Sequence, residues 1–190
     1  MNPANPTLNL NKNMAQFTPE ELMKVPDVDF MFREDGEFVI RSSKALFGGI
    51  KSVIFSLPGA FTPTCSAYQL PGYEAFYDMF KEQGIDRVYC ISVNDCFVMN
   101  AWAKDQNIEK VKLVPDGNAE FTSGMGMLVK KFNLGFAMRS WRYAAVINDE
   151  VVEQLFVEDG MEDNCPNDPY EWSSPEKVLE YLKETSSVTD

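Results

Sequence analysis

The stretch that decides the fold is Ser56-Leu57-Pro58-Gly59-Ala60-Phe61-Thr62-Pro63-Thr64-Cys65. The apolar, β-branched residues that lead into it, ending in Val53-Ile54-Phe55, are typical of a buried strand. Pro58-Gly59 then predicts a turn, and Thr62 followed by Pro63 predicts the start of a helix. Cys65 is therefore expected in the first turn of that helix.

This position favours a reactive sulfur. The N–H groups of a first helical turn have no partner inside the helix, and the helix dipole is positive at that end. A thiolate is therefore favoured over the neutral thiol, and we predict that Cys65 is a nucleophile rather than a buried core cysteine. The Thr62 hydroxyl can cap the helix and also turn toward the sulfur or an oxygen atom brought to it. Pro58 donates no hydrogen bond, so it can shield the site from water without competing for the sulfur.

The length and composition indicate one folded domain. The chain has 190 residues, of which 45% are hydrophobic, enough for a sizeable core. Residues 1–15 are rich in Asn and Pro and are expected to be disordered, so the single domain is predicted to span residues 16–190.

Charge and hydropathy limit the expected partners. The net charge is −12 and the sequence has no basic cluster, which argues against nucleic acid or an anionic membrane as the partner. There is no apolar run long enough to span a bilayer, and the N-terminus lacks the layout of a secretory signal. A cytoplasmic location is the resulting expectation.

The sequence contains no histidine, which excludes Ser-His-Asp and Cys-His catalysis and most zinc sites. An activated cysteine must then rely on arginine, lysine, hydroxyl groups and backbone dipoles. The four cysteines, Cys65, Cys90, Cys96 and Cys165, show neither the C-x-x-C spacing nor paired metal-ligand spacing. We therefore predict neither a zinc site nor a thioredoxin-type dithiol. In a reducing compartment, all four cysteines are expected to be free thiols.

Strand and helix patterns alternate along the rest of the chain. Strands are expected at 27–32 and 37–41, joined as a hairpin by the Asp35-Gly36 turn, at 52–57, 88–93 and 112–114, and as an antiparallel pair at 142–147 and 151–157. Helices are expected at 18–23, at 62–83 with a kink or break at Pro71-Gly72, at 96–105 and at 174–184. Residues 120–132 are ambiguous because Gly124 and Gly126 weaken a helical pattern. This order predicts an α/β fold with a mixed sheet.

The motif Pro58-x-x-x-Thr62-x-x-Cys65 resembles the signature of the peroxiredoxins. The sequence around this motif is similar to that of the peroxiredoxin-5-like and glutaredoxin-fused, or hybrid, branch of the redoxin family. Residues 86–95, 139–143 and 168–171 also resemble that branch, so the likeness covers roughly residues 27–183. The resemblance implies a thioredoxin-like fold, with a mixed central sheet flanked by helices and an N-terminal β-hairpin. It also implies a homodimer. The glutaredoxin module fused in some relatives is not found in this sequence.

The same resemblance implies a thiol-dependent peroxidase. The Cys65 thiolate would attack hydrogen peroxide or an alkyl hydroperoxide and become a sulfenic acid, with no cofactor or metal required. Glutathione with glutaredoxin is the expected reductant. In relatives, the arginine just before a strand holds the sulfur and peroxide with a permanent charge, which selects Arg142 here, and Arg139 is the second choice. Many relatives carry His where this chain has Gln69, so a titrating role would be lost while hydrogen bonding persists.

Two alternatives stay open. Cys165 lies among acidic residues that disfavour its thiolate, yet it can still be a resolving thiol in a two-cysteine cycle recycled by thioredoxin. Its surroundings look more like the single-cysteine members of the branch. The fold can also serve as a redox-sensing interaction module. Cys90 is expected in the core, and Cys96 begins a helix as Cys65 does, but without the preceding Thr-Pro.

Overall fold

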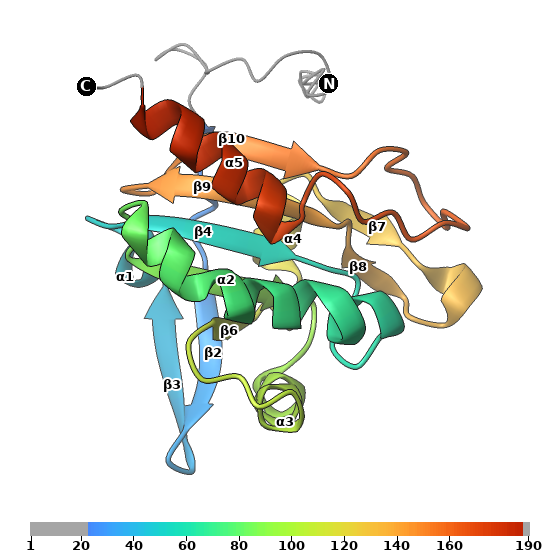
Figure 1. The fold of residues 1–190 in the computed structure, drawn as a ribbon. Helices are drawn as coiled ribbons and strands as arrows, with labels where there is room; N and C mark the ends of the chain where they lie inside the picture. The colour runs from blue at the N-terminus through green and yellow to red at the C-terminus, as the bar shows by residue number, and fades with distance from the viewer. Residues whose placement is uncertain (1–22, 188–190) are drawn as a thin grey trace, which may run out of the picture.

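The computed structural model describes residues 23–187, which are built around a six-stranded sheet (Figure 1). The strand order is β1-β10-β9-β4-β5-β6. The strands are β1 (Met23–Lys24), β4 (Lys51–Ser56), β5 (Arg87–Ser92), β6 (Lys112–Pro115), β9 (Tyr143–Asn148) and β10 (Val151–Val157). Strands β4, β5 and β6 are parallel, whereas β9 is antiparallel to β4 and to β10. The predicted mixed sheet is therefore confirmed.

Two hairpins lie outside this sheet. β2 (Asp29–Glu34) pairs with β3 (Glu37–Ser42), as predicted, and both residues of the connecting turn, Asp35 and Gly36, have positive φ angles of 48° and 81°. Such a turn matches the right-handed twist of the two strands. The second hairpin pairs β7 (Leu128–Lys130) with β8 (Met138–Ser140) and was not predicted. The ambiguous segment before it contains the short helix α4 (Glu120–Gly124), and a 3-10 turn, η2 (Phe132–Leu134), follows β7.

Helices cover both faces of the sheet. α2 (Leu70–Glu82) and α5 (Pro175–Ser186) lie side by side across one face, while α1 (Ser43–Phe47) and α4 pack on the other (Figure 1). α3 (Cys96–Asp105) packs beside β6. Successive residues of a strand point to opposite faces. Thus Val53 and Phe55 belong to the core under α2 and α5, and Ile54 belongs to the core on the other side.

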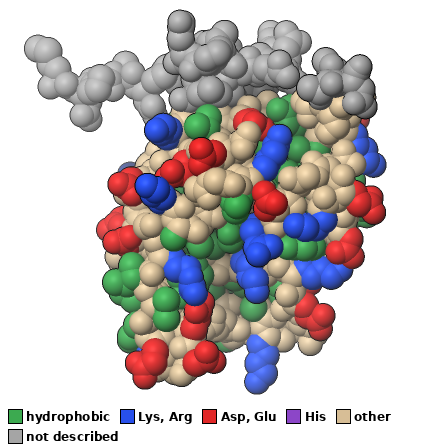
Figure 2. Space-filling view, turned by 90° about the vertical axis from the view of Figure 1, so that its left-hand side faces the viewer, with side chains coloured by type: hydrophobic (Ala, Val, Ile, Leu, Met, Phe, Trp, Pro, Cys, Tyr) green, Lys and Arg blue, Asp and Glu red, His purple; other side chains and the backbone are tan. Residues whose placement is uncertain are grey.

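Basic residues that are far apart in the sequence lie close together on one face of the protein. Lys and Arg side chains gather in the middle of the face in Figure 2, with Asp and Glu side chains around them. A cavity of about 600 Å³ is lined by basic side chains from four strands, Arg33, Arg41, Arg87 and Lys112. Arg41 pairs with Glu34 beside it. A sequence without a basic run therefore still forms a locally basic surface.

Some expectations about the N-terminal part fall outside the described residues. The disorder expected for residues 1–15 and most of the helix expected at 18–23 lie there. Met23 itself is in β1, paired with Val152, so the predicted helical end at Met23 is wrong. Pairing with the edge of β10 satisfies backbone groups there that a helix would satisfy internally. Within residues 23–187, no helix is both long enough and apolar enough to cross a membrane.

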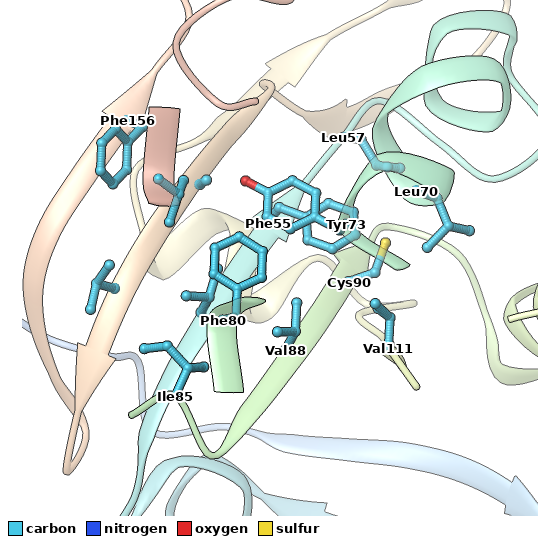
Figure 3. Close-up of a cluster of buried hydrophobic side chains, with 14 of the residues drawn as sticks. Phe55, Leu57, Leu70, Tyr73, Phe80, Ile85, Val88, Cys90, Val111 and Phe156 are labelled. Atoms are coloured by element: carbon cyan, nitrogen blue, oxygen red, sulfur yellow. The ribbon is translucent and has the colours of Figure 1, made fainter. Parts of the chain in front are cut away.

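A stack of aromatic rings joins α2 to the sheet. The Phe55 ring on β4 stacks on Tyr73 of α2 with 3.9 Å between centroids, and Tyr73 stacks on Phe80 at 5.8 Å (Figure 3). All three are buried, so the stack is part of the core between α2 and the sheet. The Tyr73 hydroxyl donates to the Ser173 carbonyl, 2.8 Å away. This contact connects α2 to the chain just before α5.

The helix that carries Cys65 is not broken at Pro71-Gly72. It begins at Pro63 and continues to Glu82, but residues Cys65–Gln69 are wound as a π-helix, η1, before α2 begins at Leu70. In η1 the Leu70 N–H donates to the carbonyl of Cys65, five residues earlier. Pro71 has no N–H to donate, and the wider turn changes the winding just before it instead of breaking the helix. At Gly72, a Cβ would lie 3.3 Å from Pro175, so glycine permits the close approach of α5.

Candidate active site

Cys65 lies at the end of the loop that follows β4. Pro58 and Gly59 are buried in this loop, and the Ser66 N–H donates to the Thr62 carbonyl at 3.0 Å, closing the first helical turn. Cys65 therefore occupies the predicted position near the helix start. Its side chain is also completely buried. A cysteine in this environment is inert unless a charge stabilises its thiolate.

Arg142 supplies that charge. Ser56, the last residue of β4, pairs with Tyr143 of β9, which places Arg142 beside the loop that leads to Cys65. The Arg142 Nη1 lies 3.5 Å from the Cys65 Sγ, and the arginine is 1% exposed. A permanent cation in direct contact with a buried sulfur favours the thiolate. The structure thus brings together the two residues that sequence reasoning paired.

Every side of the Arg142 guanidinium has a partner. Nε donates to the Pro169 carbonyl at 3.0 Å, Nη2 donates to Asp168 Oδ1 at 2.5 Å, and Nη1 donates to Gln69 Oε1. Burial alone lowers the pKa of Arg142, but the negative charges of Cys65 and Asp168 outweigh that effect, so its pKa is raised. Arg142 therefore stays protonated. These contacts also hold its position next to the sulfur.

Glu158 anchors the segment that provides Asp168 and Pro169. Its carboxylate is 2% exposed and accepts hydrogen bonds from the backbone N–H of Glu171 at 2.9 Å and of Ser173 at 2.8 Å, and from the Ser173 hydroxyl at 2.7 Å. A buried carboxylate satisfied by several donors is a strong local constraint. Sequence reasoning missed Glu158, because a glutamate after an apolar strand has no pattern that distinguishes it from a surface residue.

Thr62 and Pro58 lie in the loop that leads from β4 to the helix of Cys65. The Thr62 hydroxyl donates to the Gly59 carbonyl at 2.7 Å, rather than contacting the sulfur. This bond orients the hydroxyl oxygen and leaves lone pairs that can accept a hydrogen bond from a substrate O–H. Of the two partners expected for the Thr62 hydroxyl, the sulfur is not contacted in the structure, and a substrate oxygen stays a prediction. Pro58 lies in the buried part of the loop.

Arg139 lies farther from the chemistry than Arg142. It is half-buried, and it donates to the carbonyls of Val93 at 3.1 Å and Phe136 at 3.0 Å. A Cβ at Gly59 would be 2.9 Å from its Nη1, so the absence of a side chain there admits the guanidinium. Burial lowers the pKa of Arg139, while the nearby Cys65 opposes this shift. Arg139 therefore supports the loop, and Arg142 contacts the sulfur.

The four cysteines, all within the described part of the chain, are free thiols. Cys65 belongs to the core under α2 and α5, whereas Cys165 belongs to the core on the opposite face of the sheet. Cys90 is completely buried, and burial together with the nearby Cys65 raises its pKa well above the ordinary value. Cys96 begins α3, as predicted, and is 5% exposed. The structure shows an arginine contact only for the sulfur of Cys65 among these residues.

Comparisons with known proteins agree with this geometry. Residues 22–169 match the Redoxin family. The chain is 56% identical to Peroxiredoxin y4vD of Sinorhizobium fredii over 169 residues, which are 84% of this chain and 90% of that protein. It is 46% identical to the hybrid peroxiredoxin hyPrx5 of Haemophilus influenzae over 167 residues, 88% of this chain and 68% of that protein.

A solved structure is similar over nearly its whole length. The Plasmodium falciparum antioxidant protein, described as a 1-Cys peroxiredoxin, superposes with a TM-score of 0.83 at 39% identity. The match covers 86% of this chain and 98% of that one.

The anchor made by Glu158 can be tested by Glu158→Gln. The change replaces one carboxylate oxygen with an NH₂ group that faces at least the Glu171 N–H and removes the negative charge, so we expect the free energy of unfolding to fall by about 1–3 kcal/mol. Urea unfolding measures this loss. Glu162→Gln, at an exposed position of the same segment, is the matched control and should leave stability unchanged. Equal stabilities of the two variants would contradict the anchoring role.

Proposed function

This chain belongs to the redoxin family as a peroxiredoxin of the peroxiredoxin-5 type, and from this premise we propose that Cys65 is the residue that reduces its peroxide substrate. The observation that carries the proposal is the buried contact of 3.5 Å between Cys65 Sγ and Arg142 Nη1. The substrates are hydrogen peroxide and alkyl hydroperoxides. The remaining site residues are Thr62, Pro58 and Arg142.

The first step transfers one oxygen atom to the sulfur. The Cys65 thiolate attacks one oxygen of the peroxide, an S–O bond forms, and the O–O bond breaks. The electron pair of the broken bond leaves with the second oxygen, as hydroxide or alkoxide, which then takes a proton from solvent. Arg142 stabilises the negative charge as it moves from the sulfur to the leaving oxygen. The Thr62 oxygen accepts from the peroxide O–H and so orients it.

Pro58 keeps water away from the reacting atoms, because it is buried beside the cysteine loop and donates no hydrogen bond. The product on the protein is a sulfenic acid at Cys65. The reaction needs only the sulfur, the peroxide and later a reducing thiol. We therefore propose a cycle without a metal, flavin or haem.

Recycling of the sulfenic acid by glutathione and glutaredoxin completes the proposal. Glutathione attacks the oxidised sulfur, water leaves, and a mixed disulfide forms, which a second thiol reduces. Three observations support a single-cysteine cycle: Cys165 and Cys65 belong to cores on opposite faces of the sheet, one similar solved structure is a 1-Cys peroxiredoxin, and one relative is a hybrid peroxiredoxin. Thioredoxin with Cys165 as the resolving thiol is the competing cycle.

Homodimer formation is part of the same proposal. Phe61 and Tyr68, on the cysteine loop and η1, are 52% and 66% exposed. Exposed apolar surface next to the site is compatible with an interface between copies of the chain. We propose that a second copy of the chain covers these two side chains in a homodimer. A cytoplasmic location stays a prediction.

Intact-mass measurement after one equivalent of peroxide tests the assignment of Cys65. The reduced protein is expected to gain one oxygen atom, and Cys65→Ser is expected to gain none and to consume no peroxide above the buffer rate. The physical reason is that a serine hydroxyl does not ionise near neutral pH and is a far weaker nucleophile. Peroxide consumption by Cys65→Ser at the wild-type rate would show that the assignment is wrong.

The two arginines are distinguished by Arg142→Lys and Arg139→Lys. Lysine keeps the positive charge but cannot contact the sulfur, Gln69, Asp168 and Pro169 together, so Arg142→Lys is expected to lower the rate of peroxide reduction by about 100-fold or more. Arg139→Lys is expected to cause a smaller loss, since Arg139 donates to the backbone carbonyls of Phe136 and Val93 and not to the sulfur. Stopped-flow oxidation of the reduced proteins measures both. A larger loss for Arg139→Lys would reverse the two roles.

Steady-state peroxide consumption with the two reducing systems tests the recycling cycle. We expect turnover with glutathione plus glutaredoxin, and we expect Cys165→Ser to retain it because no second protein thiol takes part. Cys96→Ser, which changes another buried cysteine, is the matched control. If Cys165→Ser stops turnover while Cys96→Ser does not, the single-cysteine cycle is wrong. Turnover with thioredoxin and its reductase alone would identify the other reductant.

A further inference from the structure

Gln69 has an amide group of which one atom has a hydrogen-bond partner and the other has none. The side chain is completely buried, four residues after Cys65. Its Oε1 accepts from Arg142 Nη1, whereas its Nε2 has no partner among the described residues. A buried donor without an acceptor is destabilising, so its retention needs an explanation.

The orientation of this amide is determined by Arg142. A guanidinium only donates, and therefore the amide atom that faces Nη1 must be the oxygen. Exchanging the oxygen and the nitrogen of Gln69 would place two donors against each other. The unpartnered atom is thus the N–H₂ group, a donor that is available to an oxygen atom.

Gln69 and the reactive sulfur contact the same atom of Arg142. Arg142 Nη1, which donates to Gln69 Oε1, also lies 3.5 Å from Cys65 Sγ. The amide oxygen and the sulfur are therefore both in contact with this one nitrogen. Cys65 and Gln69 are the first and last residues of η1, and residues four apart project from the same side of a helix. The Gln69 amide is therefore close enough to the sulfur for a role at an oxygen atom bound there to be tested.

We propose, on the basis of the peroxidase function above, that Gln69 Nε2 donates a hydrogen bond to the peroxide oxygen that Cys65 attacks and then retains as sulfenic acid. In this step the sulfur forms the new S–O bond, and the electron pair of the O–O bond leaves with the other oxygen. The transferred oxygen keeps lone pairs throughout, and Gln69 binds one of them. Gln69 is thereby a catalytic residue of the proposed site.

The Thr62 hydroxyl cannot donate this bond while it donates to Gly59, and Arg142 already donates to Pro169, Asp168 and Gln69. An amide also suits this role because it does not titrate, so the same donor is present before and after the reaction. In a chain without histidine, Gln69 supplies this donor at any pH.

A different role for Gln69 would be to position Arg142. The two roles are separable because Arg142 keeps its bonds to Asp168 and Pro169 when Gln69 changes. Reaction with iodoacetamide reports the reactivity of the sulfur without placing an oxygen atom on it. Reaction with peroxide requires a reactive sulfur and also places an oxygen atom on it. A donor to the transferred oxygen therefore changes the second reaction and leaves the first unchanged.

The test uses Gln69→Met in the full-length, reduced protein. Methionine has a similar length and lacks the amide donor. We expect the rate of oxidation by hydrogen peroxide, measured by stopped flow, to fall by about 10-fold or more, as for the loss of one hydrogen bond to a developing charge. Alkylation by iodoacetamide should keep the wild-type rate. The thermal midpoint, measured alongside, checks that the variant is folded, because methionine removes both the unpaired Nε2 donor and the Oε1 acceptor of Arg142.

Gln154→Met is the matched control. Gln154 is also buried, also has one unpartnered amide atom, and lies on β10 away from η1. It should leave both reactions unchanged. Gln69→Glu is the second variant, because it retains an acceptor for Arg142 and lacks the N–H, and it should also slow oxidation.

The outcomes separate the possibilities. Unchanged oxidation of Gln69→Met or Gln69→Glu would overturn the proposal. Parallel loss of oxidation and alkylation in Gln69→Met would overturn it too, because Gln69 would then act through Arg142. If the wild-type protein itself fails to react with peroxide, the peroxidase function proposed above is wrong. Fast oxidation of the wild type with an unaffected Gln69→Met would contradict only the role of Gln69.

Discussion

The arrangement of this protein depends on one buried guanidinium beside one buried sulfur. Transfer of a charged group from water into a protein interior costs several kcal/mol. Arg142 is stable in that position because Asp168, Pro169 and Gln69 accept its hydrogen bonds. The cation in turn lies against the sulfur and opposes the general tendency of burial to favour a neutral thiol. Each buried group therefore has a compensating partner.

The fold supplies these two groups from distant parts of the chain. Cys65 is brought to the site by β4 and the turn that follows it, and Arg142 is brought there by the antiparallel strand β9 beside β4. The aromatic stack of Phe55, Tyr73 and Phe80 fixes the cysteine helix to the sheet. The segment after β10 then closes over Arg142 and is anchored by Glu158. Packing and hydrogen bonding thus combine to place one guanidinium against one sulfur.

Local chemistry made part of this site predictable from the sequence. Thr62 and Pro63 specify a helix start through interactions within a few residues, and the structure confirms that start. The Asp35-Gly36 hairpin is predictable for the same reason. Arg142 was selected by the resemblance to peroxiredoxins. Its four contacts, however, join residues as far as 77 positions apart, and no local pattern specifies them.

The predictions that were wrong or incomplete also failed mainly because contacts between distant residues outweighed local sequence patterns. Pro71 correctly indicated a disturbance of the helix, but the chain adopted a π-helical turn before it and no break. Met23 was assigned to a helix because the capping pattern before it was local, whereas pairing with β10 is a tertiary contact. Gln69 was recognised only as a departure from the histidine of relatives. Its unpartnered nitrogen is a property of the packed structure, where the orientation of its amide is determined by Arg142.

The most direct test of this account is the ultraviolet absorbance of the thiolate at neutral pH, taken as the difference between the reduced wild-type protein and Cys65→Ser. The account predicts a thiolate signal in the wild type that is absent from Cys65→Ser and reduced in Arg142→Met, since the guanidinium stabilises the charged sulfur. Absence of that signal from the folded wild-type protein, or the same signal in Arg142→Met, would contradict the account.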